Sequence, residues 1–399
     1  MWAGLDRRLE VTAMPQLLLP RSDGSLQIYR ADRASPYPSR AAGPFPRTVY
    51  AAAHVVADPG NSDPWGEPLV DWDATLAYRH HLWGLGFKIA EAMDTSQRGM
   101  GFDWANAQEL IRRVLGEARH VVGADLACGA GTDQLAPGEA HTIDDVIGAY
   151  QSQIDFIEGQ GGRIILMASR ALAEAARSPD NYFKVYDRVL AGCRNKVILH
   201  WLGDMFDPAL AGYWGTREVA PAMDACLAII EAHQSKIDGI KISLLDARYE
   251  IAMRRRLPAG VVMYTGDDFN YAELMAGDEA EYSHGLLGIF DAIAPAAAAA
   301  LQRLGQGDRA GYDAILAPTI ALSRKMFEAP TRNYKSGIVF LAWINGFQNH
   351  FAMIAGMQSA RSILHYADLF RLAHEADLLI DPERATARMA ALCAVNGVT

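Results

Sequence analysis

Short hydrophobic runs alternate with longer amphipathic stretches along most of the chain. The runs are rich in Val, Ile and Leu, which favours β-strands, whereas the stretches between them have the apolar spacing of a helix face. We predict eight strands, over Thr48–Val56, Phe87–Met93, His120–Leu126, Arg163–Ala168, Lys196–Trp201, Ile237–Ser243, Val261–Tyr264 and His284–Phe290. The predicted helices include Trp104–Ala118, Ile143–Gln160 and Pro221–His233. Eight such units predict an α/β fold of the (β/α)₈ TIM barrel type.

An open, doubly wound sheet is the other fold that this alternation allows. Its dinucleotide-binding members carry a Gly-x-Gly-x-x-Gly turn after the first strand. No such turn follows Thr48–Val56, and Gly129-Ala130-Gly131-Thr132 lacks the other residues of a phosphate-binding motif. The barrel is therefore the favoured fold.

The two ends of the chain have different patterns. Prolines punctuate residues 1–45, which we interpret as an N-terminal arm with a short hairpin around Ser22-Asp23-Gly24-Ser25. We predict the catalytic barrel over residues 46–300 and a C-terminal helical region that packs on it over residues 301–399. This last region contains a stripe of methionine and aromatic residues, namely Phe340, Trp343, Phe347, Phe351, Met353 and Met357. Such a stripe is typical of internal packing or of an oligomer interface.

Composition limits the partners of the protein. The 399 residues include 37 basic and 47 acidic ones, and the net charge is −10. Nucleic acids and anionic membranes attract basic surfaces, so neither is predicted as a partner. The first residues contain no apolar core of signal-peptide length, no apolar run is long enough for a membrane span, and the four cysteines form no CxxC pair. We therefore expect a cytoplasmic protein.

Lys241 is the first candidate for chemistry, because it interrupts the apolar run Ile237–Ser243. Burying an unpaired ammonium group is costly or lowers its pKa, and a neutral lysine is a nucleophile toward carbonyl carbon. In a barrel, residues late in a strand lie near the catalytic end, which favours this role. The alternative is a strand-end lysine whose stem is buried and whose ammonium group reaches water.

Four segments match one known family in order and spacing. Ile237-Asp238-Gly239-Ile240-Lys241 is similar to a Gly-Ile-Lys segment in the family's sixth strand, and Gly266-Asp267-Asp268 to a Gly-Asp-Asp segment that follows its seventh. Tyr282–Leu287, followed by Ala294-Pro295, resembles its eighth strand. Asp94-Thr95-Ser96-Gln97-Arg98 stands where the family has Gly-Thr-Thr-Gly-Glu. The chain thus resembles a divergent branch of the dihydrodipicolinate synthase and N-acetylneuraminate lyase superfamily.

The resemblance spans residues 47–375 and implies that Lys241 forms an imine, or Schiff base, with a keto substrate. The chain departs from the family at three places. Its catalytic tyrosine at the end of strand five falls on His200, and an arginine that contacts a carboxylate falls on Met205. A Pro-Tyr pair at the end of strand four is replaced within Met167–Arg170. These departures predict a substrate different from the best-known ones of the family.

The predicted activity is a class I lyase of the aldolase or dehydratase type, with no cofactor. Lys241 is the predicted nucleophile and His200 the acid–base group, because an imidazole titrates near neutral pH. The predicted substrate contacts are Thr95, Ser96, Asp94, Asp267 and Trp201. The substrate is expected to be a hydroxylated keto acid or keto sugar, because the charge of Asp94 suits hydroxyl groups. Like many such barrels, the protein is expected to be a homo-oligomer.

Two alternatives remain open from the sequence. A metal-dependent sugar lyase, isomerase or hydrolase would use His54, His200 and His284 with Asp58 or Asp125, which a barrel could bring together. No pair of these residues has the short spacing of a metal motif, so no metal site is predicted. The other alternative is a barrel that binds a sugar acid without catalysis.

Overall fold

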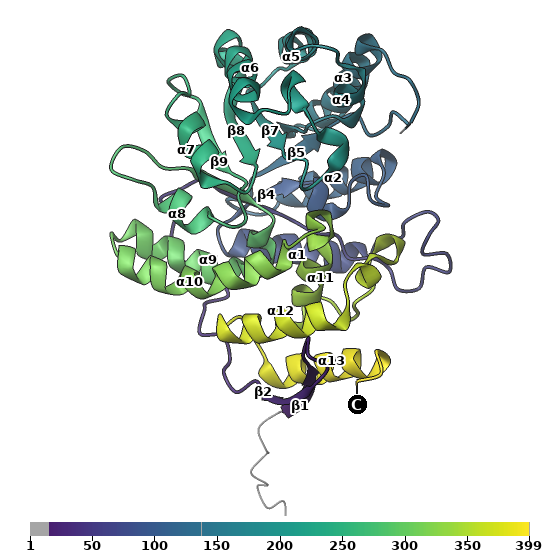
Figure 1. Cartoon of the computed structure of the whole chain (residues 1–399), viewed down its shortest axis with the longest axis vertical. Coiled ribbons are helices and arrows are strands. Elements are labelled where there is room, and N and C mark those ends of the chain that lie inside the picture. Colours follow the sequence, from purple (N-terminus) through teal and green to yellow (C-terminus); the bar gives the residue numbers. More distant parts are fainter. Residues whose placement is uncertain (1–15, 137, 399) are drawn as a thin grey trace, which may run out of the picture.

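A closed barrel of eight parallel strands forms the centre of the computed structural model, which describes residues 16–136 and 138–398 (Figure 1). The strands are β3 (Val49–Ala52), β4 (Lys88–Glu91), β5 (Leu126–Ala130), β6 (Arg163–Leu166), β7 (Val197–Leu202), β8 (Ile237–Ser243), β9 (Val262–Thr265) and β10 (His284–Leu287). They pair in chain order, and β10 pairs with β3 to close the barrel. The predicted TIM barrel is confirmed.

Helices surround the barrel and continue after it. Those between the strands are α1 (Trp72–Gly84), α2 (Trp104–Ala118), α3 (Ile143–Gly159), α4 (Arg170–Ala175), α5 (Pro179–Gly192), α6 (Val219–Ala232), α7 (Ala247–Arg254) and α8 (Tyr271–Ala276). After β10 follow α9 (Ile289–Gly305), α10 (Arg309–Met326), α11 (Tyr334–Ile344), α12 (Ile363–Glu375) and α13 (Pro382–Val395). None of the helices in the described ranges is long and apolar enough to cross a membrane.

The strand positions differ from the prediction mainly at β5. We expected a strand over residues 120–126, but residues 119–125 form the turn after α2, in which Gly123 has a φ of +80°. The strand is the following segment Leu126–Ala130, whose small residues have little β-propensity and are fully enclosed by the barrel. The first strand also ends earlier than predicted, at Ala52, and the eighth ends at Leu287 because α9 begins at Ile289.

Large and small side chains fill the barrel interior together. Tyr50, Ile198 and Tyr264 meet there with Ala90 and Ala127, and all five are buried. Because successive side chains of a strand point to opposite faces, Ile198 fixes the inward direction for His200, two residues later on β7. The interior is a packed core, so space for a substrate exists only at the end of the barrel.

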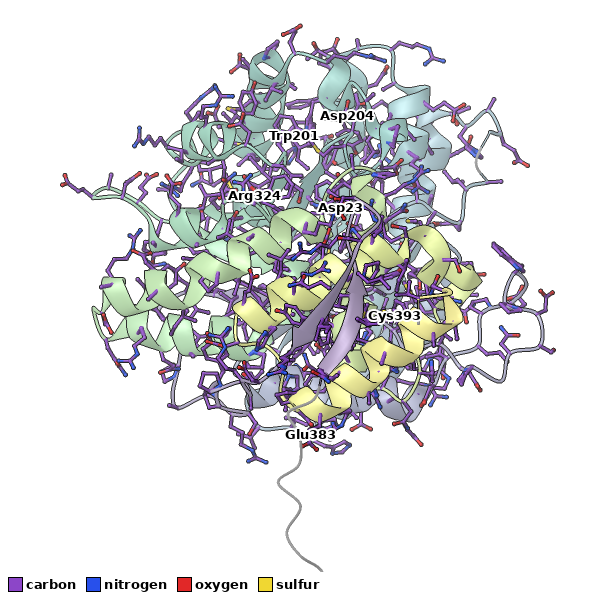
Figure 2. All side chains as sticks on the ribbon, turned by 60° about the horizontal axis from the view of Figure 1, so that its bottom comes forward. Asp23, Trp201, Asp204, Arg324, Glu383 and Cys393 are labelled. Carbon is purple, nitrogen blue, oxygen red and sulfur yellow. The ribbon has the colours of Figure 1, made fainter. Side chains whose placement is uncertain are left out.

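The predicted hairpin is present, and it packs on the C-terminal helices. Strands β1 (Gln16–Pro20) and β2 (Leu26–Arg30) pair antiparallel, and β1 contacts α12 and α13. Figure 2 shows the two purple strands beside the yellow C-terminal helices. The first residues of the predicted arm, 1–15, lie outside the described residues. Helix α9 crosses residue 300, and the division at 45 and 300 stays a prediction.

Candidate active site

Lys241 and His200 lie side by side on neighbouring strands, near the carboxyl end of the barrel. They are register partners in the parallel pair β7–β8, and both point inward because of the strand alternation described above. Both are buried, with exposed fractions of 6% for Lys241 and 1% for His200. The carboxyl end is where TIM barrels carry their active sites. The two residues that the sequence nominated for chemistry are therefore together.

The surroundings of Lys241 are tight, and the side chain is largely buried. A Cβ atom at Gly266 would lie 2.6 Å from Lys241 Cε, so glycine is needed for β9 to pass so close to the lysine. Among the described residues, no hydrogen bond or ion pair holds the Lys241 ammonium group. Burial lowers the pKa of Lys241, although Asp94 and Asp268 act in the opposite direction. These conditions increase the share of the neutral, nucleophilic amine.

Two carboxyl groups lie close enough to Lys241 to interact with its charge. Asp94, which is partly buried, begins the short 3-10 helix η1 (Asp94–Ser96) after β4. Burial would raise the pKa of Asp94, but His200, Lys241 and Lys335 outweigh it, and the net pKa is lowered. Burial raises the pKa of Asp268 to about 7. Asp94 is therefore charged at neutral pH, whereas Asp268 titrates there.

The prediction that Asp267 contacts substrate does not fit the structure. Its carboxylate accepts hydrogen bonds from the amides of Phe269 and Asn270, at 2.9 and 3.1 Å, and from Asn270 Nδ2 at 2.8 Å. Asp267 thus holds the turn before α8. Asp268, the next residue, interacts with Lys241 and accepts a bond of 2.9 Å from the Ile289 amide. The two aspartates are adjacent in the sequence, and only the folded turn shows that Asp267 points into the turn and Asp268 toward Lys241.

His200 is present at the site but is poorly suited to the predicted acid–base role. Its Nε2 atom lies 3.3 Å from Ser243 Oγ, and its buried Nδ1 atom has no partner in the described part of the chain. Burial, reinforced by the charge of Lys241, lowers the pKa of His200 to about 3. The imidazole is therefore neutral at pH 7. A group with a pKa near the working pH transfers protons better, and Asp268 is such a group.

Thr95 joins the site through a tyrosine that sequence reasoning missed. Thr95 Oγ1 lies 2.8 Å from the hydroxyl group of Tyr334, the first residue of α11, and both side chains are buried. The ring of Tyr334 stacks on Phe327, with centroids 4.3 Å apart. Its hydroxyl group lies in the electrostatic field of Asp94 and Asp268. A phenol from beyond the barrel therefore reaches the mouth, on the side of Asp94 and Asp268.

Ser96 and Trp201 are not placed to contact a substrate. The Ser96 hydroxyl group donates to the Met93 carbonyl at 2.7 Å and closes the turn of η1. Trp201 alternates with His200 on β7, so it points toward the surrounding helices and lies 6.1 Å from the Trp214 ring, centroid to centroid. Figure 2 labels Trp201 on its strand. Both predicted substrate contacts are structural in this fold.

A cavity of about 940 Å³ opens over the barrel mouth. Asp94 and His200 form part of its wall, together with Phe206 from the long loop after β7. Four cationic side chains also line it, namely Arg98, Arg170, Arg332 and Lys335. The volume lies in the range of small-molecule sites, and most of a modest ligand could be enclosed. The cavity therefore extends from His200, the neighbour of Lys241, to a chamber whose charged side chains are of both signs.

The ligands proposed for a metal-dependent enzyme do not converge. His54 Nδ1 bonds to Asp291 at 2.8 Å, and His284 Nδ1 accepts from the Thr48 amide at 3.0 Å, near the amino end of the barrel. Asp125 precedes β5 at that same amino end and pairs with Lys88. His200 lies near the opposite end. Within residues 16–136 and 138–398, no three His, Cys, Asp or Glu residues are arranged to hold a metal ion.

Residues 17–398 match the model of one family, described as "Protein of unknown function (DUF993)", and the chain belongs to that family. No curated protein matches the sequence.

Solved structures with the same fold include dihydrodipicolinate synthases from several bacteria. The enzyme from Aquifex aeolicus is 11% identical, with a TM-score of 0.63 over 84% of this chain and 99% of that one. The enzyme from Acinetobacter baumannii, solved with pyruvate, is 14% identical, with a TM-score of 0.62 over 83% and 99%. That from Bacillus anthracis is 13% identical, with a TM-score of 0.58 over 79% and 99%. The resemblance noted in the sequence is confirmed as a shared fold, at the low identity of a divergent branch.

Proposed function

We propose that the protein is an imine-forming lyase of the aldolase or dehydratase type, acting on a hydroxylated keto compound. The observation that carries the proposal is the buried Lys241, whose ammonium group lacks a hydrogen-bonding partner among the described residues and whose pKa is lowered. It stands in register with His200 at the active end of a barrel. A structural lysine would instead be paired or would extend to water.

The first step would be attack of the neutral Lys241 amine on the keto carbon. The tetrahedral adduct takes up a proton on its oxygen, loses water and becomes a protonated imine. Asp268, with a pKa near 7, could supply that proton and take up others, because it lies close enough to Lys241 for their charges to interact. The neutral imidazole of His200 would orient the adduct by hydrogen bonding.

The protonated imine then withdraws electrons from the neighbouring carbon. In an aldolase, the carbon–carbon bond breaks while a base takes the proton of the substrate hydroxyl group. In a dehydratase, a proton leaves the neighbouring carbon and a hydroxyl group leaves as water. The Thr95–Tyr334 hydroxyl pair, 2.8 Å apart, is suited to relay the proton in either case. Protonation of the enamine and hydrolysis of the imine release the product and restore Lys241.

The acidic groups favour a polyhydroxylated substrate around the reacting carbon. Asp94 is charged at the cavity wall and can accept hydrogen bonds from hydroxyl groups. The structure of the Acinetobacter baumannii enzyme is described as a complex with pyruvate, a keto acid. Keto acids and keto sugars are therefore the compounds to test. A cytoplasmic location and assembly into a homo-oligomer stay predictions.

Reductive trapping tests the proposal. The protein is incubated with pyruvate, longer 2-keto acids and keto sugars, each with borohydride, and its intact mass is measured. We expect a covalent adduct in the unchanged protein and in Lys236→Met, which removes a lysine just before the same strand, at its amino end. Lys241→Met should give none. No adduct with any compound, or an equal adduct in Lys241→Met, would contradict the proposal and favour a binding protein.

A further inference from the structure

Lys335 is a second buried lysine near the barrel mouth, and the reaction proposed above does not use it. It is 3% exposed, lines the cavity and lies in the first turn of α11. Its ammonium group donates to the Arg332 carbonyl at 3.1 Å. No carboxylate of the described residues lies within ion-pair distance of it. Burial lowers the pKa of Lys335 to about 8, and Asp94 offsets only part of this. A buried cation without a counter-ion is costly, so binding of an anion from outside the chain would be favourable there.

The place of Lys335 in its helix points the same way. The amino end of a helix carries a partial positive charge, which disfavours cations and favours anions. Arg332, three residues earlier, lies on the 3-10 helix η5 (Thr331–Asn333), is exposed at the cavity wall and has no ion pair among the described residues. Two cations without an ion pair among the described residues therefore lie at the start of α11, where the partial positive charge of the helix end favours an anion.

The other cations of the cavity are already neutralised. Arg98 pairs with Asp133, and Arg170 pairs with Asp207. Arg332 and Lys335 differ from Arg98 and Arg170, because no carboxylate of the described residues forms an ion pair with either of them. Asp94 acts on both Lys241 and Lys335, whereas Asp268 acts on Lys241. Two carboxyl groups therefore accompany the one cation Lys241, whereas Arg332 and Lys335 together have only the more distant charges of Asp94 and of Asp207, which is paired with Arg170. The Arg332 and Lys335 side is the one suited to an anion.

We infer that Lys335 and Arg332 form a subsite for an anionic group of the substrate, a carboxylate or a phosphate remote from the keto carbon that Lys241 attacks. The inference rests on the proposed function for the keto carbon, whereas the anion-binding subsite stands on its own geometry. It narrows the substrate class to keto compounds with a terminal oxyanion. It also gives the cavity a cation in place of the arginine that the chain lacks at Met205.

Direct binding of inorganic phosphate and of malonate tests the subsite without any reaction. Calorimetry compares the unchanged protein, Lys335→Met, Lys241→Met and Lys184→Met, the last of which removes an exposed lysine paired with Asp144. We expect Lys335→Met to weaken binding by about tenfold or more, as for loss of a charge-assisted hydrogen bond. The other two variants should bind as the unchanged protein does. The tighter of the two probes distinguishes a phosphate from a carboxylate site.

Trapping with matched ketones then connects the subsite to Lys241. Xylulose is compared with xylulose 5-phosphate, and 2-oxopentanoate with 2-oxoglutarate, at increasing concentrations. The anionic member of a pair should saturate trapping at lower concentration, and Lys335→Met should remove that advantage. An advantage that survives in Lys335→Met, equal anion binding by that variant, or no saturable binding of either anion overturns the inference. Anion binding that depends on Lys335 without any trapping would instead overturn the proposed function alone.

Discussion

Replacing Lys335 with methionine is predicted to make the protein more stable at neutral pH. The pKa of Lys335 falls from 10.5 to about 8 on folding, because the side chain is buried. That difference of about 2.5 units corresponds to a penalty of about 3 kcal/mol for holding the charged form in the folded state. Methionine has a similar shape and no charge. Loss of the hydrogen bond to the Arg332 carbonyl offsets about 1 kcal/mol, which leaves a net gain of about 2 kcal/mol.

The pH dependence gives this prediction its sign. Below pH 8 the lysine is protonated in both the folded and the unfolded chain, so the full penalty is present. Between pH 8 and 10.5 the folded chain loses the proton while the unfolded chain keeps it, so the penalty disappears as the pH rises. The advantage of Lys335→Met should therefore be greatest at pH 7 and vanish by about pH 10.5.

Urea unfolding of the unchanged protein and of Lys335→Met, from pH 6.5 to 10.5, measures this difference. Lys184→Met is the control, because its exposed ion pair should change stability by no more than about 0.5 kcal/mol at any of these pH values. The reasoning is refuted when Lys335→Met is less stable than the unchanged protein at pH 7. A difference that stays constant with pH refutes it equally, since it would come from packing alone.

Three further substitutions separate the roles at the barrel mouth. Tyr334→Phe should lower turnover about a hundredfold by removing the partner of Thr95, yet leave imine trapping intact; unchanged turnover would exclude the relay. Asp268→Asn should remove the change in trapping rate near pH 7, since this carboxyl group is protonated below about 7 and charged above. If the trapping rate of the variant still changes near pH 7, another group is responsible for that change. Asp267→Ala should lower the free energy of unfolding by about 1–3 kcal/mol while trapping persists, and loss of trapping in a folded variant would return Asp267 to the site.

The barrel could be predicted from the sequence because alternation of strand and helix is a local pattern. Helix α2 was predicted at its observed bounds, since its apolar spacing and the Asp103 cap are both local signals. Strand β5 was placed too early, because Leu126–Ala130 consists of small residues whose strand form depends on enclosure by the barrel. That enclosure is a property of the whole fold, which no local window contains.

The same distinction between local signals and properties of the whole fold applies to the residues of the site. Lys241 could be found because it interrupts an apolar strand, and His200 because the resemblance aligns it with a tyrosine at the end of the neighbouring strand. The choice between Asp267 and Asp268 depended on a turn, and the sequence did not resolve it. Tyr334 was missed because it follows the barrel by many residues and reaches the mouth through the packing of α11. A signal was present at its neighbours: Arg332 and Lys335 are two cations, three residues apart, that precede the apolar run Gly337–Ile344.

The central claim is that Lys241, and not another buried lysine, forms the imine. Lys335 is a demanding competitor, since burial lowers its pKa to about 8 and it lines the cavity over the barrel mouth. Tryptic mapping of the borohydride-reduced adduct decides between them, because a modified Lys241 is no longer cleaved and yields a peptide covering residues 237–248 with the added mass. The account predicts the mass on that peptide and none on Lys335. An adduct on Lys335, or on neither lysine, would contradict it.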